Sequence, residues 1–266
     1  MSSLGLYYNK YMGMDTTPEI DGLSPENDPR VEKYEGEYLR RIAEVLPELS
    51  QDQVSRVLPL AIELAQEKIQ AENLADHDQL TGLLNRRGFF KLFDLKLQEF
   101  KRNVQSEPTS DQSATPGSVL VIDLDNFGLA NKKMGELFGD KVLQEVAKAL
   151  TEGVRPGDLV VRFGGEEFLI FLSGAILENA AKVTERLHAA IPTRTSNQLD
   201  GFTQTASIGI VQLPDNLADQ LDSQHFRKLV FTQAYNAADE AMRQAKVSGK
   251  NQIVVIQSDG ATQSLL

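Results

Sequence analysis

Residues 119–127 read VLVIDLDNF, and residues 162–168 read RFGGEEF. The first stretch begins with an almost unbroken apolar run, which is typical of a β-strand that is covered on both faces. The second stretch carries two adjacent glycines between strand-like segments, which predicts a β-hairpin. If this strand and this hairpin are neighbours in one sheet, the acidic residues at their ends lie close together.

The apolar periodicity around these two stretches alternates between helical and extended patterns. Helices are predicted over residues 86–101, from about 140, and over 178–191 and 226–247, with a mobile polar loop over 103–118. Strands are predicted over residues 119–124, 159–163, 167–172, 202–213 and 252–256. This order predicts an α+β fold with a central mixed, mainly antiparallel sheet flanked by helices.

The sequence before residue 77 has a different character. Residues 1–30 are rich in Gly, Pro, Asp and Ser and predict an irregular arm, whereas residues 31–76 predict a helical extension. Two apolar stripes recur there at mostly three- and four-residue steps: Leu39, Ile42, Val45, Leu46 and Leu49, then Val54, Val57, Leu58, Ala61, Ala65 and Ile69. The second stripe suits packing against its own neighbour as well as a dimer seam. We expect residues 31–76 to act in regulation or dimerisation and residues 77–260 to form the main domain.

Composition excludes several functional classes. The 266 residues carry a net charge of −11, which argues against binding a nucleic acid polymer through its phosphates. There is no cysteine and there are only three histidines, so any metal is expected on carboxylates, as for magnesium. No apolar run approaches the ~20 residues of a membrane span, and no secretory signal is evident, so we expect a cytoplasmic protein.

Carboxylates gather at the ends of the predicted strands. Asp123 and Asp125 share one strand face because residues i and i+2 do, and Glu166 with Glu167 lies at the hairpin tip. A divalent cation between Asp123 and Glu166 would stabilise their charges and take water and phosphate oxygens as further ligands. Alternatively, Asp followed by Asn at a strand end is ordinary turn chemistry, and Gly-Gly-Glu-Glu suits a surface hairpin.

Five segments taken together resemble the GGDEF family of diguanylate cyclases. They are DQLTGLLNRRGFF (78–90), VIDLDNFGLANKKMGELFGDKVL (121–143), RFGGEEF (162–168), TASIGIV (205–211) and ADEAMRQAKVSGKNQIVV (238–255). The resemblance covers residues 78–257 and implies a palm-like sheet. It also implies an enzyme that joins two GTP molecules into cyclic di-GMP, with pyrophosphate as the leaving group.

The resemblance assigns roles to the acidic residues. Asp123 and Glu166, with Glu167 and the backbone carbonyl of Leu124, would hold Mg²⁺ or Mn²⁺. The metal would stabilise charge on the α-phosphate and help to deprotonate the attacking 3′-hydroxyl. Either Glu166 or Glu167 would accept that proton, and the sequence does not separate the base from the ligand.

Substrate contacts follow from the same resemblance. Asn131 and Asp140 would select guanine, whose N1–H and amino group a carboxylate can accept together, and Gly164 and Gly165 would let the nucleotide approach. Without the resemblance, Asp140 suits a helix N-cap. Lys246 and Lys250 would lie near the triphosphate, although lysines at this spacing also complement a helix C-terminus.

A regulatory site is implied as well. Arg155 and Asp158 stand at the spacing of the family's RxxD product-inhibition site, and Arg186 lies where a second arginine often completes it. Arginines there would bind phosphate or the guanine edge in a bidentate manner. Taken alone, Arg-Pro-Gly-Asp is a candidate for a type I or type II turn.

Four positions depart from the family pattern. Gly128 replaces a phosphate-contacting lysine, Lys132 an acidic residue, Glu136 a histidine and Arg243 a tyrosine. None of them is an inferred metal ligand or guanine contact, so we expect a working cyclase that acts as a homodimer through the helices of 31–76. A regulatory protein partner would be a further input. The alternative is a weak or inactive domain that binds cyclic di-GMP and signals through protein partners.

Overall fold

The covered strand predicted from the sequence is β1 (Gly117–Leu124), and all of its residues are buried. Val119 and Val121 pack in one hydrophobic cluster, and Leu120 and Ile122 pack in another. Successive strand residues point to opposite faces of a sheet, so neither side of this strand is exposed to solvent. Its unbroken apolar run follows from that position.

The structure is a computed structural model that describes residues 60, 63–64, 67–68, 70–106, 115–215, 217–256 and 262–265. The chain divides into two compact units, residues 1–75 and 76–266. The described residues of the first unit are helical. The predicted arm over 1–30 and the whole first apolar stripe lie outside the described residues, as do all members of the second stripe.

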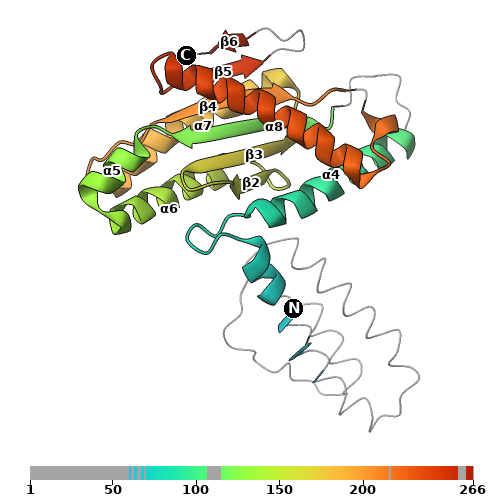
Figure 1. Cartoon of the computed structure of the whole chain (residues 1–266), viewed down its shortest axis with the longest axis horizontal. Coiled ribbons are helices and arrows are strands. Elements are labelled where there is room, and N and C mark those ends of the chain that lie inside the picture. Colours follow the sequence, from blue (N-terminus) through green and yellow to red (C-terminus); the bar gives the residue numbers. More distant parts are fainter. Residues whose placement is uncertain are drawn as a thin grey trace. The chain divides into compact units, whose positions relative to one another are not determined.

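Six strands form the sheet, in the order β2-β3-β1-β4-β5-β6 (Figure 1). Every neighbouring pair is antiparallel except β4 and β5, which are parallel. The predicted mixed, mainly antiparallel sheet is therefore confirmed. Its other strands are β2 (Leu159–Arg162), β3 (Glu167–Ser173), β4 (Ala206–Gln212), β5 (Ile253–Ile256) and β6 (Thr262–Ser264).

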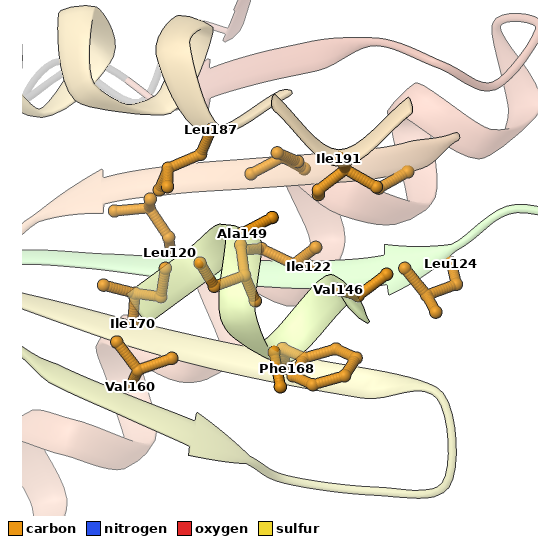
Figure 2. Packing of buried hydrophobic residues seen from close by; sticks show 14 of the residues in the cluster. Leu120, Ile122, Leu124, Val146, Ala149, Val160, Phe168, Ile170, Leu187 and Ile191 are labelled. Atoms are coloured by element: carbon orange, nitrogen blue, oxygen red, sulfur yellow. The ribbon is translucent and has the colours of Figure 1, made fainter. Parts of the chain in front are cut away.

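Helices cover both faces of the sheet. On one face lie α6 (Glu136–Glu152) and α7 (Leu177–Gln198), whose apolar sides meet Leu120, Ile122 and Ile170 (Figure 2). On the other face lie α4 (Arg86–Ser106) and α8 (Gln224–Val247), whose phenylalanines stack in the second cluster.

The structure differs from the sequence prediction mainly between β1 and β2. A short helix, α5 (Phe127–Met134), precedes α6, and α6 begins at Glu136 instead of about residue 140. Residues 103–106 and 117–118, predicted within a mobile loop, belong to α4 and β1, and residues 107–114 lie outside the described residues. A 3-10 turn, η2 (Ala218–Gln220), and β6 were not predicted. Among the described helices, none has the length and apolar character of a membrane span.

Candidate functional site

The hairpin between β2 and β3 presents Glu166 at its tip. The backbone N–H groups of Phe163 and Gly164 both donate to the carbonyl oxygen of Glu167, at 2.8 and 3.1 Å. The side chain of Glu166 is half-buried, and Gly165 beside it is exposed. The turn therefore holds a carboxylate next to backbone that carries no side chain.

The end of β1 lies directly beside this hairpin. The register pairs Asp123 with Glu167, and the Leu124 N–H donates to the Glu166 carbonyl at 3.2 Å. Burial, and then the nearby charge of Asp123, raises the pKa of Glu166. The structure thus brings Asp123, Leu124, Glu166 and Glu167 to one edge of the sheet.

Asp123 combines burial with an ion pair. Burial raises the pKa of its carboxyl group, against the opposing effect of Lys246, whose Nζ lies 2.5 Å from Oδ1. The Lys246 ammonium lies against this buried oxygen, and its hydrogen bonding and its charge both lower the pKa of the carboxyl group. The buried oxygen has an acceptor capacity that a cation would use.

These residues fit a magnesium or manganese ion that only a few protein ligands would hold. In the described part of the chain, no three acidic or histidine side chains are grouped for metal binding. Asp123 and Glu166 supply two carboxylates, and Leu124, whose backbone carbonyl is the third candidate ligand, directly follows Asp123 in the sequence. Mg²⁺ held by one or two carboxylates keeps several waters and binds substrate phosphates, which matches a site of this kind.

Asn131 and Asp140 come from two different helices. Asn131 lies on α5, and an added Cβ at Gly139 of α6 would fall 1.9 Å from the Asn131 Oδ1. The Asn131 side chain therefore lies against the backbone of Gly139, the residue before Asp140. The N-cap interpretation of Asp140 is wrong, because the helix begins at Glu136 with Gly135 as its cap.

The two lysines lie at the end of α8 and just beyond it. Lys246 is in the last helical turn and pairs with Asp123, while Lys250 follows the helix and donates to Asn126 Oδ1 at 2.5 Å. Both ammonium groups thus reach the carboxyl end of β1. The alternative role of these lysines, stabilising the C-terminus of the helix, does not explain why they contact β1 and the loop that follows it.

Asp125 lies near Asp123, in agreement with the expected common face: beyond burial, its charge contributes to raising the pKa of Asp123, and it binds Ser207, the cross-strand neighbour of Asp123. It lies one residue beyond β1, where its carboxylate accepts hydrogen bonds from Thr205, Ser207 and Asn251. The sequence identified Asp125 only as an aspartate at a strand end. Its hydrogen-bond partners could not be predicted, because they come from distant parts of the chain.

Arg155, Asp158 and Arg186 gather at the start of β2. Asp158 accepts from the Arg155 and Ser173 backbone N–H groups, each at 3.1 Å, and Arg186 donates to the Gly153 carbonyl at 2.6 Å. The Asp158 N–H donates to the Arg155 carbonyl at 3.2 Å, and φ of Gly157 is 99°, so the segment is a type II turn. Both arginine side chains are exposed, and Arg155 also donates to the Ser173 carbonyl.

Sequence reasoning missed one contact that fixes the hairpin. The Arg162 guanidinium donates to both carboxylate oxygens of Asp78, at 3.1 and 3.2 Å, and to the Gly165 carbonyl at 2.8 Å. Asp78 in turn accepts from the Thr81 N–H and hydroxyl. The motif at 78–90 is thus tied to the hairpin tip, although the two are far apart in sequence.

Comparisons with known proteins agree on one family. The family described as "Diguanylate cyclase, GGDEF domain" matches residues 75–252. The chain is 32% identical over 188 residues to Diguanylate cyclase DgcM of Escherichia coli, covering 70% of this chain and 39% of that protein. It is 32% identical over 184 residues to Response regulator PleD of Caulobacter vibrioides, covering 68% and 36%. The chain thus spans less than half of these relatives.

Solved structures show the same fold. The coiled coil and GGDEF domain of DgcB from Caulobacter crescentus, in complex with c-di-GMP, has a TM-score of 0.61 at 20% identity, covering 77% of this chain and 98% of that chain. Diguanylate cyclase SiaD from Pseudomonas aeruginosa, in complex with its activator SiaC, has a TM-score of 0.53 at 27% identity, covering 85% and 82%.

Proposed function

The chain belongs to the GGDEF family of diguanylate cyclases, and on that premise we propose that it condenses two GTP molecules into cyclic di-GMP and releases pyrophosphate. The observation that carries the proposal is the edge where Asp123 and Glu166 meet beside the hairpin tip. Two adjacent carboxylates repel each other, as the raised pKa of Glu166, due first to burial and then to Asp123, reflects. A divalent cation with a triphosphate would relieve that repulsion.

The surrounding residues suit a guanosine triphosphate. Asp123 and Glu166, with Glu167 and the Leu124 carbonyl, would hold Mg²⁺ or Mn²⁺, which supplies charge stabilisation at the α-phosphate. Asn131 and Asp140 would accept from guanine, and Gly164 and Gly165 would admit the nucleotide. Lys246 and Lys250 would contact the phosphates as point charges. Glu166 or Glu167 would take the proton of the attacking 3′-hydroxyl.

The direct test is incubation of the full chain with GTP and MgCl₂, followed by chromatography of the nucleotides. We expect cyclic di-GMP with two pyrophosphates per product molecule, and loss of product when the metal is chelated. Glu166→Gln keeps the side-chain shape without the charge and should lower turnover by about 100-fold or more.

Glu178→Gln is the matched control, because Glu178 is an exposed carboxylate of α7 that pairs with Lys182. It should turn over GTP like the parent chain. Absence of cyclic di-GMP from folded protein over a wide range of protein concentrations would contradict the proposed activity.

A second candidate function is favoured by Gly128 and by the arginine cluster. A chain without the phosphate lysine would bind cyclic di-GMP at Arg155, Asp158 and Arg186 and signal through a protein partner. Arg155→Ala separates the two functions, since a cyclase should keep or raise its turnover while losing product binding. SiaD is found in complex with its activator SiaC, and we propose that this chain forms a homodimer through residues 31–76 that a regulatory protein can likewise bind.

A further inference from the structure

Asp125 is held by hydrogen bonds on every side. It is 5% exposed, and its carboxylate accepts from the Ser207 hydroxyl at 2.7 Å and from the Thr205 hydroxyl and Asn251 N–H at 2.9 Å each. Its backbone carbonyl accepts from the Gln204 side chain at 2.8 Å. Donors from the protein thus engage both carboxylate oxygens of Asp125.

One of these bonds holds an unfavourable turn. Between α8 and β5, Lys250 and Asn251 are both left-handed, with φ of 65° and 49°. Two consecutive residues with a Cβ disfavour this conformation, so the surrounding structure must impose it. Two backbone donors do so, because the Lys250 N–H reaches the Ala245 carbonyl at 3.0 Å and the Asn251 N–H reaches Asp125.

The turn fixes the direction of the Lys250 side chain. Its ammonium group donates to Asn126, the residue next to Asp125, at 2.5 Å. The Lys250 side chain therefore extends to the residues that follow the carboxyl end of β1. A turn that relaxed to an ordinary right-handed conformation would direct the lysine elsewhere.

We propose that Asp125 is a positioning residue for the triphosphate, acting by holding the turn of residues 248–251 so that Lys250 faces the phosphates. The inference rests on the proposed function, because it takes GTP as the ligand. A carboxylate suits this role, since it accepts from two hydroxyls and one N–H together, whereas an asparagine offers only one accepting atom.

The test compares two probes by calorimetry in the presence of Mg²⁺: the α,β-methylene analogue of GTP, which releases no pyrophosphate, and guanosine. Asp125→Asn and Lys250→Met should each weaken binding of the analogue about tenfold, as expected for one charge-assisted contact. Binding of guanosine should not change, because the base is read elsewhere. The double variant should bind the analogue no more weakly than Lys250→Met alone.

Two further measurements address folding. Glycine adopts the left-handed conformation without cost, so Asn251→Gly in the Asp125→Asn background should restore most of the lost affinity. It also provides a folded variant if Asp125→Asn alone is too unstable. Asp94→Asn is the control. Asp94 accepts two hydrogen bonds from Arg227, so this substitution should lower the free energy of unfolding without changing the affinity for the analogue. In the unsubstituted chain, the Asn251 amide should exchange with solvent as slowly as those of β4.

Each outcome bears on a definite claim. Losses that multiply in the double variant, a parallel loss for guanosine, or a fast-exchanging Asn251 amide would overturn the role of Asp125. A parent chain that binds the analogue but makes no cyclic di-GMP contradicts the proposed function alone. A parent chain that binds neither probe overturns both.

Discussion

At the scale of single residues, the candidate site is a balance of charges at the end of one strand. Burial raises the pKa of Asp123, and burial followed by the nearby charge of Asp123 raises the pKa of Glu166. Lys246 offsets part of this effect at 2.5 Å. The site therefore holds more negative charge than its own lysines neutralise at close contact, which suits a ligand that brings a cation.

Gly128 can be replaced by a larger residue without a steric clash at the Cβ position. It lies on the exposed side of α5, and an added Cβ there meets nothing within 4 Å. We expect Gly128→Lys to tighten GTP binding about tenfold by restoring a charged phosphate contact. Gly128→Ala is the control, and it should raise the unfolding free energy by up to about 1 kcal/mol without changing GTP affinity. Equal affinities in both variants would show that residue 128 does not face the phosphates.

His188 on α7 gives the protein a pH dependence. It is buried, its Nε2 has no hydrogen-bond partner in the described part of the chain, and burial lowers its pKa despite opposing hydrogen bonds and the charge of Asp125. The unfolded chain therefore takes up this proton first as pH falls through about 6.5, and the unfolding free energy falls with it. The slope for one proton is at most about 1.4 kcal/mol per pH unit.

Denaturant unfolding between pH 7.5 and 5 tests this, with His188→Gln as the comparison. The variant should lose the slope that begins near pH 6.5, even if it is less stable overall. Two parallel curves would mean that His188 has the same pKa in the folded and the unfolded chain.

At the scale of elements, the hairpin owes its place to the segment that precedes α4. Arg162 links the Asp78 carboxylate to the Gly165 carbonyl, and both paired side chains are largely covered. Burial opposes ionisation of Asp78, but hydrogen bonds from Thr81 and Arg162 outweigh it and lower its pKa. A change in the residues around Asp78 would therefore be transmitted to the backbone beside Glu166.

A double-mutant cycle measures this link. Asp78→Asn and Arg162→Lys each weaken the hydrogen bonds from Arg162 Nη1 to the Asp78 carboxylate, and unfolding of the single and double variants should give a coupling free energy of about 1–2 kcal/mol. Turnover should fall about tenfold, because the hairpin tip that carries Glu166 is displaced. A coupling free energy near zero would show that the contact between Asp78 and Arg162 does not stabilise the hairpin.

Sequence periodicity was sufficient for the elements with clear apolar faces. The run at 119–124 and the glycine pair at 164–165 gave β1 and the hairpin, and β1 proved buried on both faces. It missed α5, whose single buried residue is Phe127, because a short exposed helix has almost no apolar period. It also missed the partners of Asp125, Asp78 and Lys246, since contacts across many residues of sequence depend on how the sheet is assembled.

At the scale of the whole molecule, the proposed reaction would bring two copies of the domain together. Cyclic di-GMP is built from two GTP molecules, and the described edge has one pair of carboxylates, Asp123 with Glu166, and one pair of lysines. A net charge of −11 makes the meeting of two such domains unfavourable at low ionic strength. A device that brings them together is therefore needed, and residues 31–76 are the part of the chain that we propose for it.

The last prediction is that turnover per chain depends on chain concentration. If two domains must face each other, the rate per chain should rise about in proportion to concentration while monomers dominate and then level off once dimers form. Moderate salt should move the midpoint to lower concentration by screening the repulsion between like-charged chains. The measurement is initial pyrophosphate release from nanomolar to micromolar chain, with sedimentation at the same concentrations. Arg155→Ala is the matched control, because weakened product binding prevents accumulated cyclic di-GMP from flattening the curve. A rate per chain that is constant where sedimentation shows a change from monomer to dimer would contradict a shared active site.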